Sequence, residues 1–144
     1  MLFLTHFDSF TYTENKRWRE INGVITIYNS PIELSKCVKN DDYIYVIEMN
    51  NDTNKIMGIG LIKNRVAIKY HKIYRDNNYN RYTYLGKKWI DSKLIDNATL
   101  EILETRLFKG KHHLKRSQGI VEVPIDVKTK FLDYIKTLYN LAYD

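Results

Sequence analysis

The chain has 144 residues, of which 44% are hydrophobic and 28% are charged. This length suits one domain with a single core, and the composition excludes a disordered tail, a coiled-coil rod and a collagen-like repeat. No apolar run approaches the ~18 residues of a transmembrane helix, and residues 1–10 lack the pattern of a signal peptide. We therefore expect a cytoplasmic protein without a membrane partner.

The first third of the chain predicts short strands and short helices in turn. Residues 1–5 and 23–28 are apolar, and the second run is rich in β-branched side chains, which indicates two strands. Residues 13–20 predict a helical turn that an Asn-Gly pair ends. A serine followed by a proline is typical of a helix start, so residues 30–38 predict a short second helix.

The centre of the chain predicts strands only. Four runs of β-forming residues lie at 43–49, 55–62, 66–74 and 81–90. Consecutive strands joined by short turns favour a meander that curls into a barrel. Gly58 and Gly60 lie inside the second run, where glycine marks a bulge or a close backbone approach, and we expect a barrel corner there.

The last third changes to helical spacing. Residues 98–108 and 126–143 carry apolar side chains at intervals of three and four, which predicts two helices. Residues 119–123 predict a final strand between them. The expected fold class is α+β, with a curled antiparallel β-barrel of about six strands and helices packed on one side.

Positive charge is concentrated in two parts of the sequence. Residues 63–93 contain 9 basic and 2 acidic side chains, a net charge of +7 within a chain of net charge +6. Residues 106–119 contain five basic residues, two histidines and no acid. Such blocks are typical of proteins that bind polyanions, because phosphate contacts release counterions. The alternative is a solvated lysine-rich surface.

Aromatic side chains are interleaved with the cations of the first block, residues 63–93. Rings between Lys and Arg are how single-stranded nucleic acids are held, although alternate tyrosines could equally belong to the core. The predicted nucleic-acid-binding residues are Arg75, Asn78, Tyr79, Arg81, Tyr82, Tyr84, Lys87, Lys88, Trp89, Lys109, Lys111, His112, Lys115 and Arg116. Trp18, Tyr82 and Trp89 are the candidates for an aromatic pocket.

The sequence offers little for catalysis or metal binding. Cys37 is the only cysteine, which excludes an internal disulfide and a Cys-based zinc site. His112 and His113 are adjacent and would point to different sides of an extended chain, so they form a poor chelate. No pair of carboxylates has the arrangement of an acid/base dyad. We expect no metal, no cofactor and no enzymatic activity.

Two resemblances add to this interpretation. The order of elements over roughly residues 23–90, with the Gly-Ile-Gly element after the Val-Ile-Glu-Met strand, resembles the PUA-like superfold, in particular its EVE, YTH and ASCH branches. That resemblance implies a small barrel that binds RNA or DNA and often reads one modified base in an aromatic cage. Segments 45–51, 78–84 and 108–116 look like a small protein family of large DNA viruses, which implies no particular activity.

Together these features predict one PUA-like domain over residues 1–144 that binds nucleic acid without catalysis, RNA in preference to DNA. It would read a modified base or an mRNA cap through the aromatic pocket, with a carboxylate such as Glu48 accepting N–H groups from a purine. The alternative is a viral structural or protein-interaction component that docks on an acidic partner. Its location would then be the host cytoplasm or the virion.

Overall fold

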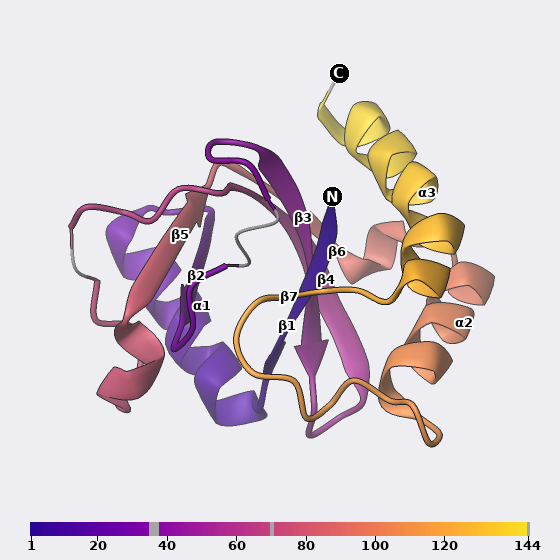
Figure 1. Ribbon diagram of the computed structural model, residues 1–144, viewed down its shortest axis with the longest axis horizontal. Coiled ribbons are helices and arrows are strands. Elements are labelled where there is room, and N and C mark those ends of the chain that lie inside the picture. Colours follow the sequence, from indigo (N-terminus) through magenta and orange to yellow (C-terminus); the bar gives the residue numbers. More distant parts are fainter. Residues whose placement is uncertain (35–37, 70, 144) are drawn as a thin grey trace.

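The computed structural model describes residues 1–34, 38–69 and 71–143, which fold into two sheets flanked by three helices (Figure 1). The elements in chain order are β1 (Leu2–Phe7), α1 (Ser9–Asn22), β2 (Thr26–Ser30), β3 (Tyr43–Asn50), β4 (Lys55–Lys63), the 3-10 turn η1 (Asn77–Asn80), β5 (Tyr82–Gly86), β6 (Lys88–Asp91), the 3-10 turn η2 (Ser92–Leu94), α2 (Asn97–Phe108), β7 (Val121–Glu122) and α3 (Ile125–Tyr143).

The chain is α+β, but the expectation of a closed antiparallel barrel is wrong. The larger sheet has five strands in the order β6-β4-β3-β1-β7, and β2 pairs only with β5 in a separate two-stranded sheet. β1 and β3 run parallel, whereas the other pairs are antiparallel. Over the described residues, β6 and β7 end the larger sheet as its two edges, so it does not close. A meander of consecutive strands cannot produce the parallel pair, which needs the crossover through α1 and β2.

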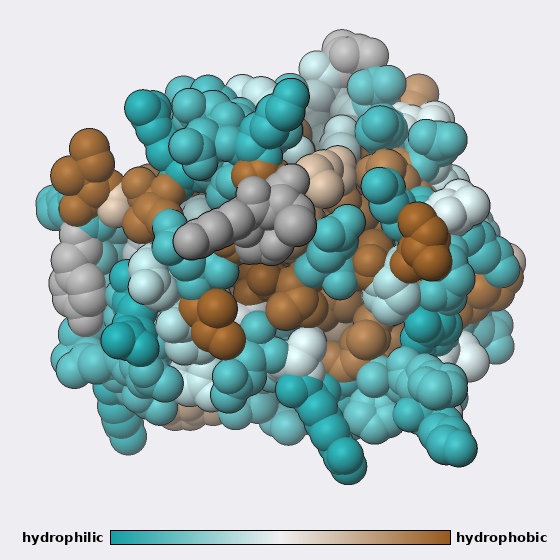
Figure 2. Space-filling view, viewed as in Figure 1, coloured by the Kyte–Doolittle hydropathy of each residue, from teal (hydrophilic) through white to brown (hydrophobic). Residues whose placement is uncertain are grey.

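Helices cover both faces of the larger sheet, not one. α2 and α3 pack on one face, whereas α1 and the β2–β5 sheet lie on the other (Figure 1). β3 is apolar at nearly every position because alternate side chains enter the two cores: Ile47 faces α2 and α3, and Val46 faces β2 and β5. Figure 2 shows hydrophilic residues over much of this face, with apolar residues gathered near the middle and a few at the left and right edges.

Three of the predicted elements differ from the structure. Residues 66–74 form no strand in their described part: Val66 makes an isolated bridge to Tyr84, and Ile68 is fully exposed. Their alternation of side chains has no partner strand to support it. Of the predicted helix at 30–38, residues 35–37 lie outside the described part of the chain, and residues 31–34 are not helical. The predicted strand at 81–90 is split between the two sheets as β5 and β6.

Gly58 and Gly60 allow two aromatic side chains to lie against the backbone of β4. A Cβ atom at Gly58 would overlap the indole ring of Trp89, and one at Gly60 would overlap the hydroxyl of Tyr28. The predicted barrel corner is therefore absent here, and these glycines mark close approach. The chain turns from one sheet to the other at Gly86, whose missing Cβ leaves room for the backbone carbonyl of Leu61.

We predict that Gly60→Ala destabilises the fold by at least about 1 kcal/mol, because the added methyl group displaces the Tyr28 hydroxyl in a filled core. Urea denaturation followed by circular dichroism measures the free energy of unfolding. The loss should be smaller when Gly60→Ala is made in a Tyr28→Phe background, where the nearest clashing atom is gone. An unchanged midpoint for Gly60→Ala in the wild-type background would contradict the close approach.

Candidate nucleic-acid interface

A groove of about 820 Å³ lies at the junction of the two sheets. Its lining comes from residues 23–25 after α1, from residues 85–88 where β5 passes into β6, and from Tyr43, Tyr45, Leu61 and Lys63 on β3 and β4. The groove thus contains three lysines and two tyrosines. Among the described residues that line it, none carries a carboxylate.

The register of the strands places these side chains on one face. Tyr43 lies opposite Lys63 and Tyr45 opposite Leu61 in the antiparallel β3–β4 pair, so all four point to the same side of the sheet. The turn of the chain at Gly86 forms another wall of the groove. Lys87 is the single residue between β5 and β6, so the chain presents it at the corner beside Lys88.

Two of the lysines lie over aromatic rings. The Lys63 Nζ atom is 5.3 Å from the centroid of the Tyr43 ring, whose side chain is 59% exposed. The Lys88 Nζ atom is 5.1 Å from the centroid of Tyr143, at the end of α3. Cation–π contacts of this kind hold ammonium groups near a ring while leaving them hydrated. The groove therefore offers cations and a ring face side by side.

Three tyrosines in contact lead from the groove to the end of α3, and only the first of them, Tyr45, lines the groove. Tyr45 packs edge-on against Tyr139 with centroids 5.0 Å apart, and Tyr139 stacks on Tyr143 at 5.7 Å. The Tyr143 hydroxyl accepts a hydrogen bond from the backbone N–H of Trp89 at 2.8 Å and donates one to the backbone carbonyl of the same residue at 2.7 Å. Burial raises the pKa of Tyr45 and Tyr139, so both phenols are neutral at physiological pH.

Glu48 lies on the opposite face of β3 and is buried, with 4% of its surface exposed. Its carboxylate accepts a hydrogen bond from the Tyr28 hydroxyl at 2.5 Å and from the Trp89 indole N–H at 3.1 Å. Burial raises the pKa of Glu48, and the two hydrogen bonds oppose that rise. The carboxylate is thus engaged inside the protein and is not presented to a purine.

The structure distributes the predicted binding residues over several places. Lys87 and Lys88 line the groove, whereas Trp18 and Arg75 line a second cavity beside α1. Tyr84 is fully buried, and its hydroxyl accepts a hydrogen bond from the Leu34 N–H at 2.9 Å.

The three candidates for an aromatic pocket do not share one cavity. Tyr82 packs against the core between β3 and the small sheet, and Trp89 turns its N–H toward Glu48. Trp18 is a residue of α1 and lines the second cavity. The rings therefore do not form a cage.

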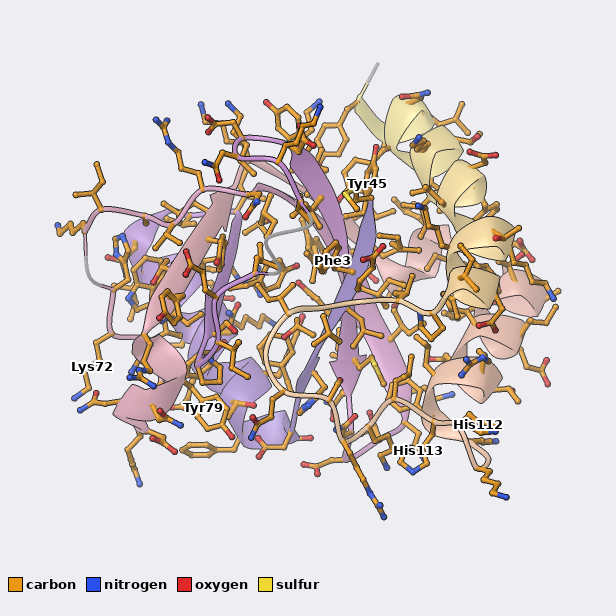
Figure 3. All side chains as sticks on the ribbon, in the orientation of Figure 1. Phe3, Tyr45, Lys72, Tyr79, His112 and His113 are labelled. Atoms are coloured by element: carbon orange, nitrogen blue, oxygen red, sulfur yellow. The ribbon has the colours of Figure 1, made fainter. Side chains whose placement is uncertain are left out.

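The remaining predicted residues lie in two loops. Asn78, Tyr79 and Arg81 are exposed around η1. The second block lies between α2 and β7 and consists of Lys109, Lys111, His112, Lys115 and Arg116. Figure 3 shows Lys72 and Tyr79 at one side of the molecule and His112 and His113 at the other, so the two basic blocks do not form one surface.

Sequence reasoning missed Tyr43, Tyr45 and Lys63. Tyr43 and Tyr45 could have been predicted to lie together, because residues two apart in a strand point to the same face of the sheet. Lys63 belongs to the basic block by sequence, but its place beside Lys87 and Lys88 depends on the contact between Gly86 and Leu61, which joins distant segments.

No protein-family model matches the chain, and no curated protein or solved structure shows significant similarity to it. The resemblance to the PUA-like superfold therefore stays a prediction. In the described part of the chain, no helix is long and apolar enough to cross a membrane. No group of three His, Cys, Asp or Glu side chains within the described ranges is placed to hold a metal ion.

The raised pKa of Glu48 predicts a pH-dependent stability. The unfolded chain loses this proton at the ordinary pKa of glutamate, but the folded chain holds it to higher pH. The free energy of unfolding should therefore fall as pH rises from the ordinary pKa through the folded value. Glu48→Gln keeps an acceptor for Tyr28 or Trp89 and should remove this fall.

Urea titrations at several pH values between about 4 and 8 measure this fall in the free energy of unfolding. The range begins at about the ordinary pKa of glutamate, where the fall begins. Asp133→Asn, at an exposed carboxylate of α3, is the matched control. If the free energy of unfolding of Glu48→Gln depends on pH in the same way as that of the wild type, the pKa of Glu48 is not raised by burial.

Proposed function

We propose that the protein binds single-stranded nucleic acid in the groove between its two sheets. The observation that carries this proposal is the lining of the groove, which combines Lys63, Lys87 and Lys88 with the exposed ring of Tyr43 and, among the described residues, no carboxylate. Lysines neutralise phosphates and release counterions. A tyrosine face stacks on a base whatever its sequence.

The geometry favours a single strand over a duplex. In a duplex, neighbouring pairs cover the faces of each base, so only an unpaired base can stack on Tyr43. The groove volume of about 820 Å³ is within the range of sites that enclose small ligands, and a duplex is too wide to enter such a site. We expect RNA rather than DNA as the ligand, and oligo(U) compared with oligo(dT) tests that preference.

The same cations would attract an acidic protein, which is the alternative function. The two functions differ in their need for a ring face: docking on carboxylates uses the lysines, whereas a strand of bases also uses Tyr43. Substitutions of the lysines and of the tyrosine therefore separate them.

We predict that Lys63→Gln or Lys88→Gln weakens the binding of fluorescein-labelled oligo(U) measured by anisotropy. Each loss of a phosphate contact should also reduce the slope of log K against log salt by about one. Lys111→Gln is the matched control, because Lys111 is exposed but lies in the loop between α2 and β7. If the wild type shows no salt-dependent binding at micromolar concentration, the proposal is wrong and the acidic partner replaces it.

Tyr43→Ala should cost about 1–3 kcal/mol of binding free energy and leave the salt slope unchanged, since it removes stacking and no charge. Tyr79→Ala is the control at another exposed tyrosine, which is 43% exposed and does not line the groove. Thermal melts verify that both variants fold. Equal affinities for the two variants would show that the Tyr43 ring makes no contact with a base.

A further inference from the structure

A second cavity, of about 440 Å³, lies along α1. Phe10, Arg17, Trp18 and Ile21 line it from the helix, where their spacing of three, four and seven residues places them on one face. Ile73 and Arg75 line it from the loop before η1.

This cavity combines the same kinds of side chain as the groove. Trp18 is half-buried and packs edge-on against His71, with ring centroids 5.3 Å apart, so its position is fixed. Phe10 is 56% exposed, and the Arg75 guanidinium lies 5.7 Å from the centroid of its ring. Arg17 is exposed at the rim. Two cations and two rings thus surround a space smaller than the groove.

The single acid among the described lining residues does not cancel these cations. Glu14 accepts a hydrogen bond from the backbone N–H of Arg75 at 2.9 Å, so its carboxylate is tied to the protein. The two guanidiniums leave a positive balance at the rim. Charge complementarity therefore favours an anionic chain over an apolar partner in this cavity.

Residues close together at the C-terminal end of α1 line both cavities. Ile21 lines the second cavity and Gly23 lines the groove, with only Asn22 between them. Gly23 ends the helix in the left-handed conformation, with φ 66°, and the chain after it, at Val24 and Ile25, lines the groove.

We propose that a single strand bound in the groove continues past the end of α1 into this second cavity. Trp18 stacks on one of its bases, and Arg17 and Arg75 contact its phosphates. This inference rests on the proposed function and extends it, because it predicts a binding site longer than the groove alone.

Oligonucleotide length tests this extension. Oligo(U) of about 4 and of about 12 residues spans the site sizes of small single-strand-binding domains. The wild type should bind the longer oligomer at least about tenfold more tightly, which corresponds to one stacked base. The longer oligomer alone should quench the fluorescence of Trp18, and Trp18→Phe should abolish that quenching.

The substitutions Arg17→Gln and Arg75→Gln should each lower affinity for the longer oligomer by about tenfold or more, as expected for a lost hydrogen bond to a charged group, and leave the affinity for the shorter one unchanged. Lys16→Gln is the control beside Arg17, and Arg81→Gln is the control for Arg75. Both control residues are exposed and line neither cavity.

The outcomes separate this inference from the proposed function. If the shorter oligomer binds and the arginine variants keep the full advantage of the longer one, the strand does not enter the second cavity. An equal loss for both lengths, or an equal loss in the controls, would likewise overturn the inference, because it reflects net charge alone. If neither oligomer binds the wild type, the proposed function itself fails.

Discussion

The arrangement of the two sheets depends on the hydrogen bonds that the buried carboxylate of Glu48 accepts. This carboxylate joins Tyr28 of the small sheet to Trp89 at the edge of the large one through hydrogen bonds of 2.5 Å and 3.1 Å. Both donors reach it because Gly60 and Gly58 leave room for their rings against β4. Burying an ionisable group is costly unless it is hydrogen-bonded, so the rings and the glycines act as one unit. Replacing Glu48 with an apolar residue would remove the acceptor of both the Tyr28 hydroxyl and the Trp89 indole N–H.

The same contact fixes which side chains reach the groove. Adjacent residues of a strand point to opposite faces, so Trp89 turned inward to Glu48 places Lys88 on the groove side. A slip of one residue in the β4–β6 pairing would exchange the two. Gly60 opposite Trp89 and Gly58 opposite Asp91 set the observed register. The binding surface is therefore a consequence of the polar core rather than a separate feature.

Local patterns in the sequence were sufficient for the elements that have strong periodicity of their own. The strands at 43–49 and 55–62 and the helix at 126–143 were predicted close to their observed bounds. The sequence could not predict their assembly, because the parallel pairing of β1 with β3 depends on contacts between distant segments. Residues 66–74 show the converse error: their alternation is typical of a strand, but in their described part only Val66 and Ala67 pair with a neighbouring strand, β5. Charge density along the chain had the same limitation: it placed Lys88 and His112 in one predicted site, whereas Lys88 lies on β6 at the groove and His112 lies in the loop between α2 and β7.

The C-terminal turn of α3 links the edge of the sheet to the groove. Tyr143 uses one hydroxyl to satisfy both the N–H and the carbonyl of Trp89 on the outer side of β6. An uncovered edge strand would offer these groups to another chain. The ring of the same tyrosine carries the Lys88 ammonium and stacks on Tyr139, which is held in the core. Because helix ends fray more readily than their centres, this stacking keeps the last turn in place. The side chain of Tyr143 thus pairs with the backbone of Trp89 at the edge of the sheet and positions the Lys88 ammonium beside the groove.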